Sequence, residues 1–143
     1  MAYGGDAGGE AVAGRGHNAP CSNRDFDFFY RGLEAEQLLI QKCGGCGTLR
    51  SLPTPFCAEC RSFEWEAVPV SGGGRVHSYV IHHYPPLPGF ETPHLIAVID
   101  LEEGVRLVAA MDGTAPDALQ VGAPVTAEFL RRGDVAAYRF RLS

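Results

Sequence analysis

Two Cys-x-x-Cys pairs are the part of this sequence best suited to chemistry: Cys43 with Cys46 and, after ten intervening residues, Cys57 with Cys60. Each pair presents two thiolates from one tight turn, and two such turns facing each other make a four-sulfur cage. Zinc prefers this tetrahedral sulfur environment, and a complete four-cysteine set leaves no coordination position for water or substrate. The pattern therefore predicts a structural Zn²⁺ site that stabilises the fold and takes no part in catalysis.

Other uses of the same cysteines stay open at the level of sequence. Two disulfides or a redox-active Cys-x-x-Cys pair would need the same residue types, although the spacing favours a metal. Iron in a rubredoxin-like site is a further alternative. Five cysteines, four of them in metal spacing and Cys21 alone, are typical of a reduced cytoplasmic protein rather than of a secreted disulfide framework.

The remaining residues suggest no active site. His82 and His83 invite an acid–base or metal role, but adjacent side chains of a strand point to opposite faces and do not converge on one ion. The single lysine, Lys42, adjoins Cys43, which argues against Schiff-base catalysis. The sequence contains neither a phosphate-binding glycine motif nor a nucleophile elbow. We therefore predict no catalytic residue.

Charge and hydropathy argue against several further classes of protein. The net charge is −5, and from residue 75 onward six arginines face eight acidic residues, a net of −2. A phosphate backbone needs a basic surface, so this balance disfavours nucleic acid. No apolar run reaches the length of a membrane span, and the N-terminus lacks the features of a signal peptide. We expect a cytoplasmic protein with no membrane contact.

An aromatic helix is expected ahead of the cysteines. Residues 1–21 are rich in Gly and Ala and resemble a flexible tail or linker. Residues 23–36 then predict a short helix, with Ser22 or Asn23 as its N-cap. One stripe of this helix carries apolar side chains, with Phe28 lying off it: Phe26, Phe29, Tyr30 and Leu33. Such stripes usually pack on a core, but exposed aromatics also supply binding energy to a partner.

The rest of the chain predicts a mainly β fold. Strands at 37–42, 48–52 and 63–68 surround the cysteine turns, and Ser71–Gly74 predicts a flexible hinge between modules at 22–70 and 71–143. Five further strands with glycine turns favour a small closed barrel of OB type: 75–82, 94–101, 105–110, 124–130 and 136–142. A proline-rich loop between the first two projects Leu87 and Phe90 as apolar contacts.

A helix (25–33), a strand (38–43), a compact four-cysteine ribbon and an OB barrel, in that order, resemble one family over residues 22–143. It is the family with a rubredoxin-like zinc ribbon and an acyl-CoA-associated OB fold, and the sequence looks closest to the accessory domain paired with the thiolase-like aldolase of bacterial steroid side-chain degradation. The resemblance implies that Cys43, Cys46, Cys57 and Cys60 bind zinc and that the partner chain supplies the catalytic residues. Arg61 departs from the Gly common in such turns.

The resulting prediction is a non-catalytic accessory subunit of a thiolase-like retro-aldolase, which cleaves a steroid side-chain β-hydroxy acyl-CoA to a ketosteroid and propionyl-CoA. The resemblance implies a heterotetramer with two of each chain and leaves contact with acyl-CoA open. The residues predicted to bind the partner are aromatic or apolar: Phe26, Phe28, Phe29, Tyr30, Leu87 and Phe90. One alternative is a bridging, CoA-channelling subunit of a thiolase and hydroxymethylglutaryl-CoA synthase complex, and a second is a single-strand nucleic-acid-binding protein.

Overall fold

The computed structural model describes residues 24–86 and 92–143, which form one short α-helix and two antiparallel sheets. The elements follow one another in this order: α1 (Asp27–Glu34), β1 (Leu39–Cys43), β2 (Leu49–Arg50), β3 (Trp65–Pro69), β4 (Gly73–His82), β5 (His94–Leu101), β6 (Arg106–Ala110), the 3₁₀ turn η1 (Pro116–Ala118), β7 (Pro124–Arg132) and β8 (Val135–Leu142). The predicted tail and the lone Cys21 lie outside the described residues. The predicted mainly β fold class is confirmed.

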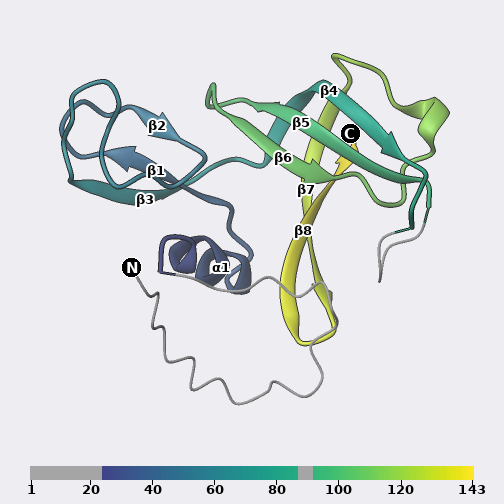
Figure 1. Ribbon diagram of the computed structural model, residues 1–143, viewed down its shortest axis with the longest axis horizontal. Helices are drawn as coiled ribbons and strands as arrows, with labels where there is room; N and C mark the ends of the chain where they lie inside the picture. The colour runs from purple at the N-terminus through teal and green to yellow at the C-terminus, as the bar shows by residue number, and fades with distance from the viewer. Residues whose placement is uncertain (1–23, 87–91) are drawn as a thin grey trace.

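Strands β4 to β8 form a nearly closed barrel (Figure 1), in the order β6-β5-β4-β7-β8. Along β5 the side chains of Leu95, Ala97 and Ile99 point into the core at every second position, as strand geometry requires. Phe140 of β8 is completely buried among them. The hydroxyl of Tyr138 donates to the carbonyl of Val108 at 2.9 Å and so links β8 to β6, the two end strands of the sheet. The predicted five-stranded barrel is confirmed.

The cysteine region forms a separate three-stranded sheet, in the order β2-β1-β3. The buried side-chain oxygen of Gln41 accepts hydrogen bonds from Arg50 Nε at 3.1 Å and from the backbone N–H of Thr54 at 3.0 Å, which holds the loop after β2 against the central strand. The third strand departs from its predicted half-buried character, since β3 is exposed along almost its whole length. It is an edge strand with β1 as its neighbour, so one side of it faces solvent.

Two of the glycines between the two sheets belong to a strand. Gly73 and Gly74 are the first residues of β4, paired with β7, so the prediction of a flexible segment is wrong for these two positions. A Cβ atom on Gly74 would lie 2.6 Å from the carbonyl oxygen of Asp100. Glycine is therefore required here because β4 and β5 approach each other closely, not because the backbone moves.

Helix α1 is shorter than predicted. It begins at Asp27, and Phe26 occupies the N-cap position with no side-chain cap bond, so the predicted start at residue 23 is wrong. Ser22 and Asn23, the predicted caps, lie outside the described residues. Packing of the apolar stripe accounts for the helix instead, since its Leu33 is buried in the barrel core cluster. Arg31 pairs with Asp27 at 2.8 Å on the solvent side.

The helix lies between the two sheets and contacts both, through β1 on one side and β8 on the other (Figure 1). The carboxylate of Glu34 adds an ion pair to Arg131 in β7, at 3.0 Å. The ribbon sheet, the helix and the barrel therefore form one connected structure. Within the described part of the chain, no helix has the length and apolar character needed to cross a bilayer.

Candidate functional site

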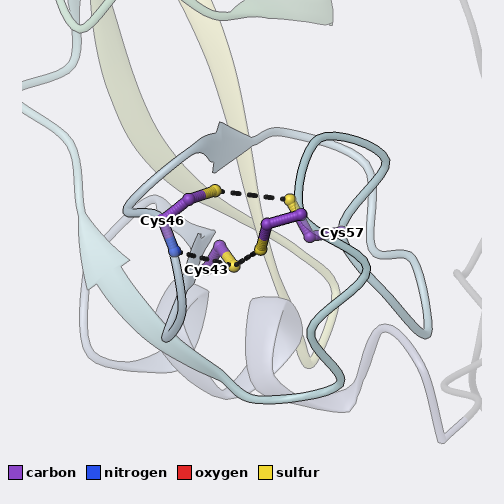
Figure 2. Close-up of side chains that lie close together, drawn as sticks. Cys43, Cys46 and Cys57 are labelled. Atoms are coloured by element: carbon purple, nitrogen blue, oxygen red, sulfur yellow. Dashed lines mark hydrogen bonds between the residues drawn. The ribbon is translucent and has the colours of Figure 1, made fainter.

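The four cysteines come together at one end of the ribbon sheet, with their sulfur atoms all within 4.8 Å of one another. Figure 2 shows the sulfurs of Cys43, Cys46 and Cys57 pointing toward a common centre. The Sγ atoms of Cys43 and Cys60 lie 3.5 Å apart, and those of Cys46 and Cys57 lie 3.6 Å apart. Sulfurs around a tetrahedral zinc with bonds of about 2.3 Å lie about 3.8 Å apart, whereas those of a disulfide lie about 2.05 Å apart. The cage has the dimensions of a four-coordinate metal site.

The first cysteine turn is shaped by backbone hydrogen bonds. The N–H of Cys43 donates to the carbonyl of Thr48 at 2.9 Å, and the N–H of Gly47 donates back to the carbonyl of Cys43 at 3.0 Å. Gly47 adopts a φ of +77°, in the left-handed region that glycine enters without a Cβ clash. A Cβ on Gly45 would lie 3.1 Å from the sulfur of Cys60. Glycine at these two positions therefore lets the backbone fold closely around the cysteine sulfurs.

The second turn repeats this pattern with one difference. The N–H of Cys57 donates to the carbonyl of Ser62 at 2.9 Å, and the N–H of Arg61 donates back to Cys57 at 2.8 Å. Arg61 thus takes the place of Gly47, with a φ of 65°. The left-handed conformation costs a residue with a Cβ about 1–2 kcal/mol. The arginine that replaces the usual glycine therefore strains the backbone locally, and the cysteine sulfurs keep their positions.

The sulfurs differ in their ease of ionisation. Backbone N–H groups of Cys46 and Gly45 point at the sulfur of Cys43 and lower its pKa to about 6, against an opposing effect of burial. At Cys60 the N–H of Ser62 lowers the pKa, but the neighbouring thiol of Cys43 and burial outweigh it and raise the pKa to about 11. Thiolates this close raise one another's pKa, so all four ionise together only around a cation. This donor set fits a bound metal, and Cys43, Cys46, Cys57 and Cys60 would hold zinc as a structural crosslink.

The helix beside the cage joins the two modules through aromatic contacts. Phe28 packs against Trp65 of β3, with ring centroids 5.0 Å apart, and Phe29 packs against Tyr138 of β8 at 5.6 Å. Phe26 and Tyr30 lie 6.4 Å apart on the same helix. All four predicted partner-binding aromatics of the helix are half-buried, so each packs within the chain and keeps some surface exposed. Their contact with a partner stays a prediction.

The other predicted contact residues, Leu87 and Phe90, lie outside the described residues. The structure adds a pair that the sequence analysis did not single out. Phe56 and Phe63 flank Cys57 and Cys60, with ring centroids 6.1 Å apart, and their exposed fractions are 47% and 76%. We call this pair the ribbon aromatic patch. Phe63 begins the alternating segment that predicted a strand at 63–68, whereas Phe56 lies outside any such pattern. Large aromatics beside a metal turn were a usable signal for both.

A second group of side chains was also missed, at an apolar cleft between α1, the segment after β2 and strands β5, β6 and β8. His94 lines this cleft with a side chain only 6% exposed, and its Nδ1 lies 3.0 Å from Asp112 Oδ1. Arg132 donates to the other oxygen of Asp112. The three residues come from different segments that barrel closure brings together, which explains why spacing did not reveal them. The one signal in the sequence was His94, a histidine at the first position of a largely apolar strand.

A helix, a four-cysteine ribbon and an OB-type barrel define a class of small zinc-ribbon and OB-fold proteins. The ribbon matches the family model described as "ChsH2, rubredoxin-like zinc ribbon domain" over residues 31–66. The barrel matches "ChsH2, C-terminal OB-fold domain" over residues 67–130. The chain belongs to this ChsH2/DUF35 family, and the expected resemblance is confirmed.

Three proteins related to this chain carry different descriptions. The chain is 43% identical over 111 residues to "Probable enoyl-CoA hydratase alpha subunit" of Thermomonospora curvata, covering 78% of this chain and 35% of the relative. It is 39% identical over 119 residues to "3-oxo-4,17-pregnadiene-20-carboxyl-CoA hydratase alpha subunit" of Mycobacterium tuberculosis, covering 83% and 38%. The chain thus spans little more than a third of these two proteins. A "DUF35 domain-containing scaffold protein" of Methanocaldococcus jannaschii is 36% identical over 106 residues, covering 71% and 74%.

Among solved structures, the chain is similar to one titled "Ltp2-ChsH2(DUF35) aldolase". The TM-score is 0.82 at 40% identity, and the match covers 87% of this chain and 98% of that chain. The chain is therefore homologous to ChsH2/DUF35 subunits of aldolase and hydratase complexes.

Proposed function

We propose that this chain is the non-catalytic accessory subunit of a thiolase-like retro-aldolase that cleaves a steroid side-chain β-hydroxy acyl-CoA into a ketosteroid and propionyl-CoA. In this reaction the bond between the α and β carbons breaks, the β-hydroxyl loses its proton to become the ketone, and the α carbon gains a proton as propionyl-CoA. The observation that carries the proposal is the likeness to the aldolase structure, which extends over 98% of that chain at a TM-score of 0.82.

The division of labour follows from the chemistry of the ribbon. Four thiolates complete the coordination of zinc, so the ion can brace the ribbon but offers no position to a substrate. The partner chain accordingly supplies the acid–base groups, and two copies of each chain assemble in the cytoplasm, where cysteines stay reduced. The aromatic helix and the ribbon aromatic patch hold the partner, because exposed aromatics near the centre of an interface supply much of its binding energy.

Co-purification tests the assembly. The chain is co-expressed with a thiolase-like aldolase partner, one chain carrying an affinity tag, and the complex is sized by light scattering. Phe63→Ala removes a side chain that is 76% exposed, so we expect a weaker complex from a subunit of unchanged stability. The matched control is Val121→Ala, at a position 68% exposed away from the ribbon. Wild-type chains that elute separately at micromolar concentration would contradict the proposal.

A second candidate has one specific observation in its favour, the likeness to an archaeal scaffold protein over 74% of that protein. In this role the chain would bridge two enzymes, a thiolase and hydroxymethylglutaryl-CoA synthase, and pass CoA thioesters between them. The two candidates differ in which enzyme co-purifies. Binding of single-stranded nucleic acid has no such support, since five of the six barrel arginines are paired with carboxylates.

A further inference from the structure

The cleft beside α1 has the size and lining of a small-molecule site. Its volume is about 670 Å³, within the range of about 300–1,000 Å³ typical of ligand pockets. One wall comes from Phe26 and Phe29 of the helix, and Leu52 of the ribbon module closes one side. The opposite wall comes from the barrel strands, with Val108 and Ala110 of β6. Sites of this kind commonly lie where two modules meet.

The barrel wall of this cleft is apolar on a face where polar residues are expected. Leu107 and Ala109 point into the core, so Val108 and Ala110 between them point outward. Ile96 of β5 pairs with Ala110 and lines the cleft beside it. The outer face of an antiparallel sheet is normally polar, yet Val108 is 60% exposed here. An apolar strip of this kind indicates that another group covers it.

Charged residues bracket the strip, and each has a partner of opposite sign. At one end of β6, Arg106 pairs with Asp100 at 2.7 Å. Beyond the other end, Asp112 binds both the buried His94 and Arg132. The four residue steps from Arg106 to Ala110 span about 14 Å. Since these charges are already neutralised, the cleft offers little to phosphates, and it suits an uncharged apolar group.

We propose that this cleft binds the uncharged, polycyclic end of the acyl-CoA, a steroid ring system, and leaves the phosphate-bearing nucleotide of CoA outside. This inference rests on the proposed function, because it assigns the cleft to the substrate of the same aldolase. A rigid ring system can pack between the apolar strand face and the aromatic side chains that line the cleft, and it loses little conformational freedom on binding. The accessory subunit thereby contributes to selecting substrates by their ring portion.

Binding to this chain by itself tests the inference. The probes are androst-4-ene-3,17-dione, an uncharged steroid ketone, and free CoA, each titrated into ¹⁵N-labelled protein and followed by two-dimensional NMR. We expect saturable shifts for the steroid at Ile96, Val108 and Ala110, and no displacement of the steroid by CoA. Val108→Asp places an unpaired carboxylate against the ligand and should weaken binding about tenfold or more. The matched control is Val121→Asp, at a position 68% exposed that does not line the cleft.

Several results would contradict steroid binding in the cleft. Absence of saturable steroid binding, equal binding by Val108→Asp and wild type, or competition by CoA would overturn the inference. The inference would also be overturned if the partner protected the backbone amides of the cleft from hydrogen exchange while no steroid bound there. In that case a segment of the partner protein would occupy the cleft. Co-purification of the partner is measured on the same variants. A Val108→Asp chain that keeps its partner but loses steroid supports the inference, and loss of the partner from wild type counts against the proposed function alone.

Discussion

At the level of single residues, the two cysteine turns differ in backbone strain. Arg61 holds the left-handed conformation that Gly47 holds in the other turn. We predict that Arg61→Gly raises the free energy of unfolding by about 1 kcal/mol, because glycine adopts this conformation without a Cβ clash. Urea denaturation of the zinc-bound protein measures the change. As the opposite control, Gly47→Ala should destabilise the protein, and an unchanged or less stable Arg61→Gly variant would refute the strain.

A second residue-level prediction concerns acid stability. Hydrogen bonds and charge from Arg139 and then Arg141 lower the pKa of Glu128 below its ordinary value of 4.5. A carboxyl with a lowered folded-state pKa stabilises the fold above its unfolded-state pKa, and this contribution is lost as the pH falls through the lower value. Glu128→Gln should therefore be less stable than wild type near pH 7, with the difference shrinking below about pH 4.

Urea denaturation at a series of pH values measures this difference. Loss of zinc in acid affects both proteins at the same pH, so the difference between them isolates Glu128. The exposed Glu66 of β3 gives the control substitution, Glu66→Gln. A destabilisation of Glu128→Gln that is constant from pH 7 to about pH 3 would show that charge is not its cause.

Residue types and spacing predicted part of the site. Four cysteines at metal spacing were sufficient to predict that Cys43, Cys46, Cys57 and Cys60 cluster, because each pair acts within one local turn. The link from His94 to Asp112 and Arg132 was not predictable in this way. It depends on how the barrel closes, and no local pattern encodes which distant strands meet.

At the level of elements, helix α1 connects the ribbon and the barrel through different faces. Phe29→Ala removes the contact with Tyr138 and should lower the free energy of unfolding by about 2 kcal/mol, less than for a fully buried Phe. Phe28→Ala removes the contact with Trp65, the single tryptophan, so it should change the fluorescence of that residue with a smaller loss of stability. Identical effects of the two substitutions on fluorescence would show that the helix detaches as a unit.

Alternating residues and turn residues predicted the strand positions well. They did not predict where the helix begins or how deeply β3 is buried. Residues 94–101 were predicted as a strand and form β5 with the same bounds. The helix start was misplaced because polar residues before Phe26 look like caps, while packing of the stripe sets the observed start. The burial of β3 was overestimated because alternation predicts two different faces but not whether another layer covers one of them.

At the level of the whole molecule, the two sheets depend on different forces. The main apolar core cluster lies largely in the barrel, whereas the small ribbon sheet carries the four clustered sulfurs at one end. We predict one zinc per chain and, on its removal with a chelator, four additional reactive thiols, a fluorescence change at Trp65 and a retained barrel. Elemental analysis, thiol titration and circular dichroism measure these effects. Complete unfolding of the barrel on metal removal would contradict the separate roles of the two sheets.

The central claim is that the chain braces and completes an enzyme whose chemistry lies in another polypeptide. The most direct test is turnover of a steroid side-chain β-hydroxy acyl-CoA by the purified aldolase partner alone, by this chain alone and by the reconstituted complex. The account predicts ketosteroid and propionyl-CoA from the complex, none from this chain, and little from the partner alone. Full activity of either polypeptide by itself would contradict it.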